Sequence, residues 1–295
     1  MEKNLFVSLI GEPNVGKSTL LNAMIGCKVA IVTPKAQTTR MPQNGIVTKG
    51  EIQYVITDTP GLLDPRNRLD ARMSRSIIES CSDSDLVMLV VYPKEKLSDA
   101  ELKILSKLRD STVPVFLCVN KSDIIKQPSK KGSYYTDVLG KQFKFDGSCL
   151  VSAKTGDGLD RLFQEIDRFA VPGEHQFSDD DMTDSSVRSM CAEIMREKLF
   201  LNLREEIPYG CAVMTESFRE REDGITEIEF VILCDKENHR GIIIGKHGSM
   251  LKKISTEARA DIEELLGTKV FMKSFVKVRR DWRNSESVMH ELSEM

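Results

Sequence analysis

The chain has 295 residues, of which 40% are hydrophobic and 29% are charged, and its formal net charge is −3. Such a composition is typical of a globular protein, and the length predicts two domains rather than one. No stretch of about 18 consecutive apolar residues occurs, which excludes a membrane-spanning helix. The seven cysteines contain no CxxC pair, so we expect neither a disulfide framework nor a zinc site. We also expect no signal peptide, and therefore a cytoplasmic protein.

Short apolar segments alternate with amphipathic ones from Leu5 to about Ala170. Several of the apolar segments have no polar interruption, as is typical of parallel strands covered by helices on both faces. We therefore predict a doubly wound α/β domain with a mostly parallel sheet over residues 1–170. The expected strands are Leu5–Ile10, Ile46–Val47 with its neighbours, Ile52–Thr57, Leu86–Val91, Val113–Val119 and Cys149–Ser152. The expected helices are Lys17–Ile25, Leu69–Cys81, Ser98–Arg109 and Leu159–Phe169.

Residues 171–186 are polar, acidic and rich in turn formers, which predicts a linker. Beyond it, a long helix is followed by two strands with a charged hairpin tip, a second helix and a last strand. These elements predict a smaller α+β domain over residues 187–295. Their expected bounds are Val187–Leu203, Ala212–Phe218, Ile225–Leu233, Ser249–Leu266 and Lys269–Lys277.

A phosphate-binding loop follows the first expected strand. Residues 11–18, GEPNVGKS, match the pattern GxxxxGK[ST] between a strand and a helix. The glycines let successive backbone N–H groups face the β-phosphate, Lys17 adds charge to the β- and γ-phosphates, and the Ser18 hydroxyl coordinates Mg²⁺. The dipole of the following helix adds to the attraction. The predicted nucleotide-binding residues here are Gly11, Glu12, Pro13, Asn14, Val15, Gly16, Lys17, Ser18 and Thr19.

A second motif, DTPG, follows the strand Ile52–Thr57. At this position the carboxylate of Asp58 can reach Mg²⁺ through a water molecule. The N–H of Gly61 is then free to sense the γ-phosphate. The remaining predicted contacts of this segment are Thr59, Pro60 and Leu62.

The sequence NKSD at the end of Val113–Val119 favours guanine over adenine. A carboxylate at Asp123 can accept hydrogen bonds from N1 and N2 of guanine, and adenine has no such donors. Asn120 fixes the loop, and the aliphatic stem of Lys121 can lie across the base. After the last strand of this domain, the loop expected to contact the guanine carbonyl is formed by Ser152, Ala153 and Lys154. The predicted ligand is therefore GTP or GDP rather than ATP.

A glycine loop also marks the second domain. Gly245-Lys246-His247-Gly248 is a GxxG sequence with an apolar, β-rich run before it and an amphipathic helix after it. A GxxG turn lets the backbone press against nucleic-acid phosphates, and Lys246 and His247 add charge or hydrogen bonds. Residues 236–283 contain twelve Lys and Arg against six Asp and Glu, and this excess of six favours a phosphate backbone as partner.

In this order the motifs resemble those of the Ras-like translation-factor class of GTPases, and within it those of the Era family. Residues 37–40, QTTR, resemble the switch I segment of that family, and residues 205–209, EEIPY, resemble its turn into the first KH strand. Residues 182–184, 258–263, 276–278 and 282–283 match as well. The resemblance covers nearly the whole chain. It implies a P-loop GTPase domain followed by a type II KH domain.

The resemblance also implies how the metal is held. Thr39, with Thr38 as the alternative, is expected to close on Mg²⁺ when the γ-phosphate is present. The implied metal ligands are then Ser18, Thr39 and Asp58. The implied catalytic residues are Lys17, Thr39, Asp58 and Gly61.

Two positions bear on the rate of hydrolysis. Leu62 and Leu63 stand where Ras-type enzymes place a water-orienting glutamine, which predicts slow intrinsic hydrolysis. Asn14 resembles the asparagine with which some relatives use K⁺ in place of an arginine finger. Stimulation by potassium is therefore a hypothesis.

For the second domain, the resemblance implies the 3′ end of 16S rRNA as ligand and maturation of the small (30S) ribosomal subunit as process. The expected RNA-binding residues are Lys236, Arg240, Gly245, Lys246, His247 and Gly248. Where the family has ERxSQK before the loop, this chain has DKENHR, with His239 and Arg240 replacing Gln and Lys. Trp282 is expected either to stack on a base or to pack in the core. The tail Ser285–Met295 shows no pattern that we can interpret.

Other functions agree with parts of this pattern. A pure RNA-binding module with a vestigial nucleotide fold conflicts with the intact Lys17, Ser18, Asp58 and Asp123. A GTPase of the same class that acts on another RNA, in tRNA modification or at a membrane surface stays open, including peripheral contact with the inner face of the cell membrane. A metabolic kinase is excluded, because NKSD has no use there. We expect a monomer that binds no DNA.

Overall fold

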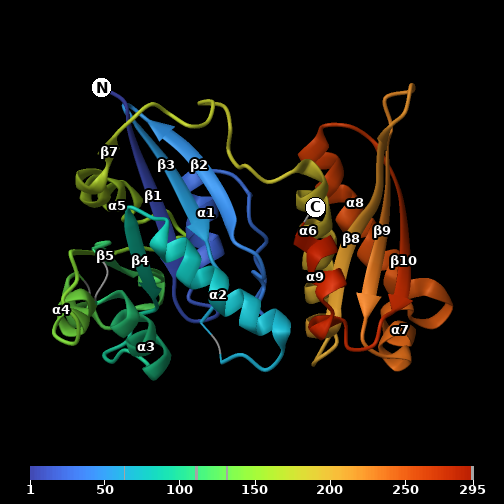
Figure 1. The fold of residues 1–295 in the computed structure, drawn as a ribbon, viewed down its shortest axis with the longest axis horizontal. Coiled ribbons are helices and arrows are strands. Elements are labelled where there is room, and N and C mark those ends of the chain that lie inside the picture. The colour runs from blue at the N-terminus through green and yellow to red at the C-terminus, as the bar shows by residue number, and fades with distance from the viewer. Residues whose placement is uncertain (63, 110–111, 131, 294–295) are drawn as a thin grey trace. The chain divides into compact units, whose positions relative to one another are not determined.

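The computed structural model describes residues 1–62, 64–109, 112–130 and 132–293. The chain divides into two compact units (Figure 1), of which residues 1–66 with 70–184 form the first and residues 67–69 with 185–295 the second. Leu63 and the last two residues of the tail Ser285–Met295 lie outside the described residues. Among the helices that are described, none has the length and apolar character needed to cross a membrane.

The first unit is built on a mostly parallel sheet with the strand order β2-β3-β1-β4-β5-β6. β2 runs antiparallel to β3, the short β7 pairs antiparallel with β1, and the other neighbours are parallel. This topology confirms the predicted doubly wound α/β fold. The strands are β1 (Lys3–Ile10), β2 (Gln43–Lys49), β3 (Ile52–Asp58), β4 (Leu86–Val91), β5 (Val115–Val119), β6 (Gly147–Leu150) and β7 (Val171–Pro172).

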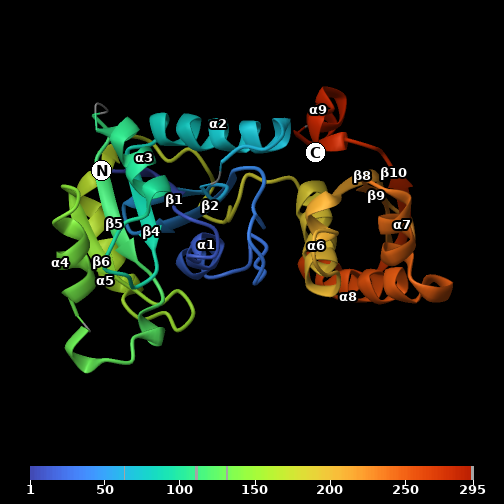
Figure 2. The ribbon, with the colours of Figure 1, turned by 90° about the horizontal axis from the view of Figure 1, so that it is seen from below.

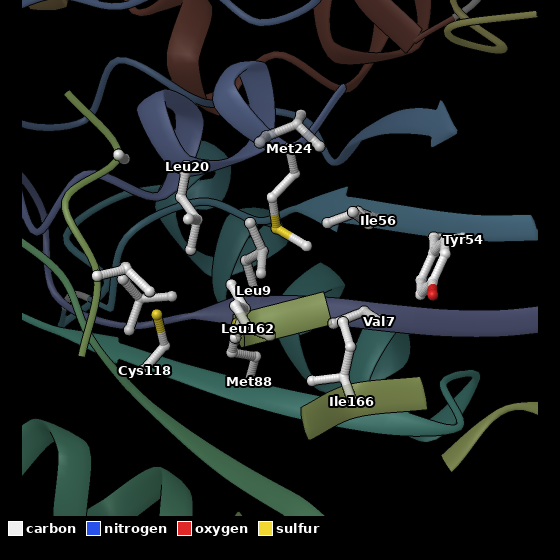
Figure 3. Close-up of a cluster of buried hydrophobic side chains, with 14 of the residues drawn as sticks. Val7, Leu9, Leu20, Met24, Tyr54, Ile56, Met88, Cys118, Leu162 and Ile166 are labelled. Carbon is white, nitrogen blue, oxygen red and sulfur yellow. The ribbon is translucent and has the colours of Figure 1, made fainter. Parts of the chain in front are cut away.

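Helices cover both faces of this sheet (Figure 2). On one face, α1 (Lys17–Ile25) and α5 (Leu159–Ile166) bury apolar side chains against the strands, as Figure 3 shows for Leu20 and Leu162. On the other face lie α2 (Arg68–Ser82), α3 (Asp99–Leu108) and α4 (Tyr134–Gly140). Because β4 is covered on both faces, all six of its residues are buried. This explains its uninterrupted apolar sequence.

Most predicted strands differ from the observed ones by a few residues at their ends, and two of these differences have a clear physical reason. β5 begins at Val115 rather than Val113, because Pro114 has no N–H with which to join the ladder. β6 ends at Leu150 rather than Ser152, and the backbone N–H of Ser152 instead donates to the carbonyl of Asp157 at 2.8 Å. The loop expected at the guanine base therefore begins inside the segment that the sequence assigned to a strand.

The helices α4 and α5 also differ from the prediction. α4 was not expected, because its sequence YYTDVLG contains few good helix formers. It is held by tertiary packing, since Leu139 is fully buried in the apolar cluster on that face of the sheet. α5 ends at Ile166, and a 3₁₀ turn takes over from Asp167 to Phe169.

The segment that follows the first unit's last helix is tied to the sheet. The side-chain oxygen of Gln53 accepts hydrogen bonds from the N–H groups of Gln176 and Phe177 at 2.9 and 3.0 Å. The N–H of Ile46 donates to the carbonyl of Met182 at 2.9 Å. Residues 171–184 thus run along β2 and β3, while their role as part of a linker between two domains stays a prediction.

The second unit is a three-stranded sheet with the order β10-β9-β8, in which β8 and β9 are antiparallel and β9 and β10 parallel. α6 and α8 pack on one face, where alternate residues of β9, such as Phe230 and Ile232, are buried with Leu199 and Ile254. α9 contacts β8 and lies on the opposite side of the sheet from α8 (Figure 2). The elements are α6 (Val187–Asn202), β8 (Cys211–Glu220), β9 (Thr226–Cys234), α7 (Glu237–Ile244), α8 (Ser249–Leu266), β10 (Val270–Val278) and α9 (Glu286–Ser293).

One expectation for this unit was wrong, and a segment without an interpretable pattern proves to be partly helical. The apolar run before the GxxG loop is helical rather than β-like, because it forms the end of α7, closed by a hydrogen bond from the Gly245 N–H to the Gly241 carbonyl at 2.9 Å. The tail that showed no pattern contains α9, whose Val288 is fully buried.

Trp282 belongs to the core of the second unit. Its side chain is fully buried, and its indole N–H donates to the carbonyl of Gly210 at 2.8 Å. Of the two roles considered for this residue, the structure shows packing. A buried indole with its N–H satisfied has no face left for a base.

We predict that Trp282→Ala lowers the free energy of unfolding of the second unit by about 3–5 kcal/mol, because it removes a buried indole. Trp282→Phe keeps most of the packing and loses the hydrogen bond to Gly210, so its cost should be smaller, about 1–3 kcal/mol. Both changes are measured by urea unfolding followed by far-UV circular dichroism. Tryptophan fluorescence cannot be used, because Trp282 is the only tryptophan and both variants lack it. Equal midpoints for wild type and Trp282→Ala would contradict the packing role.

Candidate functional site

The loop between β1 and α1 needs its glycines for steric reasons. At Gly11, which has φ +150°, a Cβ atom would lie 2.2 Å from the carbonyl oxygen of Val90. At Gly16, with φ +96°, a Cβ atom would lie 2.5 Å from Nδ2 of Asn120. Only glycine therefore lets the loop pass this close to β4 and to the loop after β5.

Lys17 is buried at the start of α1, and its ammonium group donates to the carbonyls of Gly11 at 3.0 Å and Glu12 at 3.2 Å. Burial lowers its pKa to about 8, against the opposing attraction of Asp58 and Glu12. The two carbonyls compensate the charge only in part. Phosphate oxygens in the loop would replace them as stronger partners and favour the charged lysine.

Three oxygen-bearing side chains meet next to the phosphate loop. The hydroxyls of Ser18 and Thr39 lie 3.0 Å apart, Thr39 donates to Oδ2 of Asp58 at 2.9 Å, and Ser18 donates to the same oxygen at 2.5 Å. Adjacent oxygens around an octahedral Mg²⁺ with bonds of about 2.1 Å lie about 3.0 Å apart. The other carboxylate oxygen, Oδ1 of Asp58, is buried without a hydrogen-bond partner in the described chain. These residues therefore fit a magnesium ion.

The pKa of Asp58 responds to the same surroundings. Burial raises it, while the charge of Lys17 and the hydroxyl hydrogen bonds of Ser18 and Thr39 lower it. The net shift of the pKa is upward, so the neighbouring protein groups do not fully compensate the carboxylate. A divalent cation next to Asp58 would supply the missing charge.

Thr38 and Thr39 differ in their contacts. The Thr38 hydroxyl is 2.7 Å from that of Thr33 and donates to the carbonyl of Lys35 at 2.9 Å, so it serves the turn of its own loop. Thr39 alone of the two is joined to Asp58. The assignment of the metal ligand to Thr39 stays a prediction, and this geometry favours it over Thr38.

The segment after β3 is fixed by backbone contacts. The Thr59 hydroxyl donates to the carbonyl of Leu9 at 2.6 Å, and the N–H of Leu62 donates to the carbonyl of Gly11 at 3.0 Å. A Cβ atom at Gly61 would lie 2.9 Å from the ring of Pro13. The DTPG segment therefore lies directly against the phosphate loop, as a γ-phosphate sensor requires.

The predicted base-binding residues lie together at the ends of β5 and β6. Asn120 donates to the carbonyl of Val15 at 3.0 Å and accepts from the N–H groups of Lys121 at 2.7 Å and Ala153 at 2.9 Å. Ser152 donates to Oδ1 of Asp123 at 2.7 Å and so orients that carboxylate. Lys154 is exposed beside them.

Lys121 links the base-binding loop to the phosphate loop. It has a left-handed backbone, φ 63°, and its ammonium group donates to the carbonyl of Asn14 at 2.5 Å. Its aliphatic stem therefore runs from the base-binding loop to the phosphate loop. That this stem lies across a guanine base stays a prediction.

The sequence motifs did not reveal one contact of the phosphate loop. Lys94, in the loop after β4, forms an ion pair with Glu12 at 3.2 Å and with the buried Glu101 at 2.6 Å. Glu12 and Lys94 are 82 positions apart, so no local pattern could have joined them.

The predicted RNA-binding loop connects α7 to α8. Gly245 has φ 73° and ψ 174°, and a Cβ atom there would lie 2.7 Å from Cβ of Met250. Gly248 has φ 79°, and the intervening Lys246 and His247 are exposed. The backbone of the loop is thus open to a phosphate chain, with the charged side chains at its tip.

The segment that departs from the family pattern divides between surface and interior. Lys236 and Arg240 are exposed, whereas His239 is buried and its Nδ1 has no hydrogen-bond partner in the described chain. His239 therefore points into the unit instead of toward solvent. Of the two substituted positions, only Arg240 can contact an RNA from the surface.

The comparison with protein families divides the chain in the same two parts. Residues 6–121 match the family model described as "50S ribosome-binding GTPase", and residues 206–283 match the one described as "KH domain". Both kinds of domain were expected from the motifs.

Whole proteins of similar sequence cover nearly the full chain. It is 41% identical over 290 residues to GTPase Era of Ruminiclostridium cellulolyticum, covering 98% of this chain and 97% of that protein. It is 42% identical over 290 residues to GTPase Era of Geobacter metallireducens, covering 97% of this chain and 96% of that protein.

Two solved structures are similar over their whole length. The fold matches an Aquifex aeolicus Era variant bound to GDP·AlF₄⁻ with a TM-score of 0.93 and 33% identity, covering 98% of each chain. It matches Era in complex with MgGDPNP and nucleotides 1506–1542 of 16S ribosomal RNA with a TM-score of 0.94 and 33% identity, covering 99% of each chain.

We predict that Lys17→Met separates stability from ligand binding. Without nucleotide, the variant should be as stable as the wild type or more so, because it no longer buries a charge with a lowered pKa. GDP at 100 times its Kd stabilises the wild type by about 2.7 kcal/mol, and in Lys17→Met the same concentration should add less than about 0.5 kcal/mol. Thermal unfolding with and without Mg·GDP measures both, and the exposed Lys107→Met is the matched control. Unchanged stabilisation by GDP in Lys17→Met would contradict the assigned role.

Proposed function

This chain belongs to the Era family of GTPases, and from that premise we propose that it binds GTP with Mg²⁺ in its first unit and the 3′ end of 16S rRNA through the KH domain of its second. Hydrolysis to GDP and phosphate would then switch it off in the maturation of the small ribosomal subunit. The observation that carries the proposal is the full-length similarity to a relative solved with both ligands. The GxxxxGKS, DTPG, NKSD and GxxG motifs are intact in this chain, whereas residues 235–240 depart from the family pattern.

In the first unit, each group of residues has a separate task. The backbone of residues 11–16 and the ammonium group of Lys17 hold the β- and γ-phosphates. Ser18, Thr39 and Asp58 hold Mg²⁺, which neutralises charge on the phosphates when bound. Thr39 and Gly61 respond to the γ-phosphate, since both belong to loops that lie against the phosphate loop. Asp123, oriented by Ser152, selects guanine.

Hydrolysis by this site is expected to be slow. The residue after Gly61 is Leu62, whose N–H is bonded to Gly11 and whose side chain packs partly against the apolar cluster of the sheet. It offers no group that could orient a water molecule for attack. Positioning supplies much of the acceleration of phosphoryl transfer, so its absence leaves a slow timer.

In the second unit, we propose that the RNA is held by the backbone of Gly245 and Gly248 and by Lys246, His247, Lys236 and Arg240. The family model of the first unit is described for the 50S ribosome, whereas the full-length relative was solved with 16S rRNA. We choose the small subunit because the KH domain is the part that would bind RNA. The relative solved with 16S rRNA matches this chain over its full length, including the KH domain. An alternative is a GTPase of the same class that acts on another RNA or at the membrane surface.

We also propose the division into a GTPase domain over residues 1–170, a linker over 171–186 and a KH domain over 187–295. The protein would act as a cytoplasmic monomer on the 30S subunit, with no DNA partner. Peripheral contact with the inner face of the membrane would belong to the alternative function.

We predict that a labelled oligonucleotide of the 16S rRNA 3′ end binds more tightly with a GTP analogue than with GDP or without nucleotide. Lys246→Ala should weaken binding about fivefold and reduce the slope of log K against log salt by about 0.7, because one phosphate contact is lost. Lys269→Ala is the matched control, since this lysine lies past the far end of α8, about 27 Å along the helix from the loop. Binding is measured by fluorescence anisotropy at several salt concentrations. If no nucleotide state binds while GTP still binds, the ribosomal assignment is wrong.

We predict that potassium stimulates GTP hydrolysis. Asn14 has a left-handed backbone, φ 64°, and an exposed side chain at the phosphate loop, where a monovalent cation could take over the charge of an arginine finger. Turnover in KCl should exceed that in NaCl by about tenfold, a small part of what an arginine finger supplies. Asn14→Ala should remove the difference without abolishing GTP binding. Phosphate release measured at equal ionic strength gives the ratio, and equal rates in the two salts would refute the hypothesis.

A further inference from the structure

A nearly buried lysine joins the phosphate loop to the helix α3. Lys94 lies in the loop after β4, with its side chain 11% exposed. Its ammonium group donates to Oε2 of Glu12 at 3.2 Å and to Oε2 of Glu101 at 2.6 Å. One cation therefore neutralises two carboxylates that come from separate parts of the chain.

Glu101 is a fixed anchor for Lys94. Its side chain is fully buried, and Oε2 also accepts a hydrogen bond from the N–H of Ser98 at 2.8 Å. In return, the Ser98 hydroxyl accepts from the N–H of Glu101 at 3.3 Å, which completes a capping box at the start of α3. Because the carboxylate is tied to backbone, Lys94 is held in one place.

Glu12 supplies the carboxylate of the phosphate loop that Lys94 contacts. It is the second residue of the phosphate loop, and its carbonyl accepts a hydrogen bond from Lys17 at 3.2 Å. The phosphates that Lys17 attracts would therefore meet a second anion in the same loop.

We propose that Lys94 is a positioning residue of the nucleotide site, which pins and neutralises Glu12 so that the phosphate loop can accept a guanine nucleotide, and GTP above all. The inference rests on the proposed function, since it concerns the same site. Lys94 acts through Glu12 and touches neither nucleotide nor metal. Its removal leaves two uncompensated carboxylates, Glu12 in the phosphate loop and Glu101 in the first turn of α3.

The consequence is a difference between two nucleotides. GTP carries more negative charge than GDP, so an unpaired Glu12 repels it more. Lys94→Met should weaken binding of a GTP analogue about tenfold or more, and binding of GDP less. Lys94→Arg keeps the charge and should bind both almost as the wild type does. The exposed Lys96→Met is the matched control and should change neither affinity.

The effect of Lys94 on nucleotide binding can be separated from its contribution to stability through Glu101. Glu101→Gln in the Lys94→Met background removes the buried unpaired charge and should restore thermal stability, but not affinity for the GTP analogue. Adding Glu12→Gln to that double variant should restore affinity to within about threefold of wild type, because the repelling anion is gone. The loss in Lys94→Met should also shrink as salt rises, since charge repulsion is screened.

The test is equilibrium titration of the full chain with fluorescent GDP and GTP analogue, alongside thermal unfolding of each variant. The proposal is overturned if Lys94→Met, or Lys94→Met with Glu101→Gln, binds the GTP analogue as tightly as wild type. It is equally overturned if Glu12→Gln restores nothing. Failure of the wild type itself to bind GTP would instead refute the proposed function.

Discussion

The carboxamide of Asn120 joins three loops that arise far apart in the sequence. Its side chain is 1% exposed, and its hydrogen bonds reach Val15 in the phosphate loop, Lys121 in its own loop and Ala153 after β6. The three loops follow β1, β5 and β6, whose carboxyl ends meet at one edge because these strands are parallel. The predicted phosphate-binding and base-binding loops therefore share one buried polar group, and Gly16 leaves room for it.

Around this connection the site carries charges that its own residues compensate only in part. Lys17 has a lowered pKa and Asp58 a raised one, each chiefly because of burial. Both shifts mean that the charged forms are less stable here than in water. A phosphate next to Lys17 and a divalent cation next to Asp58 would stabilise the charged forms of both groups.

In the second unit, the predicted RNA-binding loop is defined by its backbone conformation. The glycine loop between α7 and α8 has left-handed residues at Gly245, His247 and Gly248, and its tip side chains are exposed. Such a loop can approach a phosphate chain closely only if its supports are rigid. The support comes from the helix-covered sheet and from Trp282, which ties the start of β8 to the turn after β10 through Gly210.

The sequence alone determined the doubly wound sheet, the order of the two domains, and the identity of the phosphate, guanine and GxxG segments. These follow from local patterns: uninterrupted apolar strands, glycine spacing, and side chains whose chemistry suits one ligand. The role of each predicted residue stays a prediction, although the structure brings Ser18, Thr39 and Asp58 within hydrogen-bond distance.

Only the tertiary structure decided matters that depend on distant partners. It made α4 a helix despite weak helix formers, turned Ile242–Ile244 into the end of a helix, and buried Trp282 and His239. It separated Thr39 from Thr38 by their contacts, and it placed Lys94 between Glu12 and Glu101. Each of these results from packing between segments far apart in the chain, and a local pattern carries no information about such a neighbour.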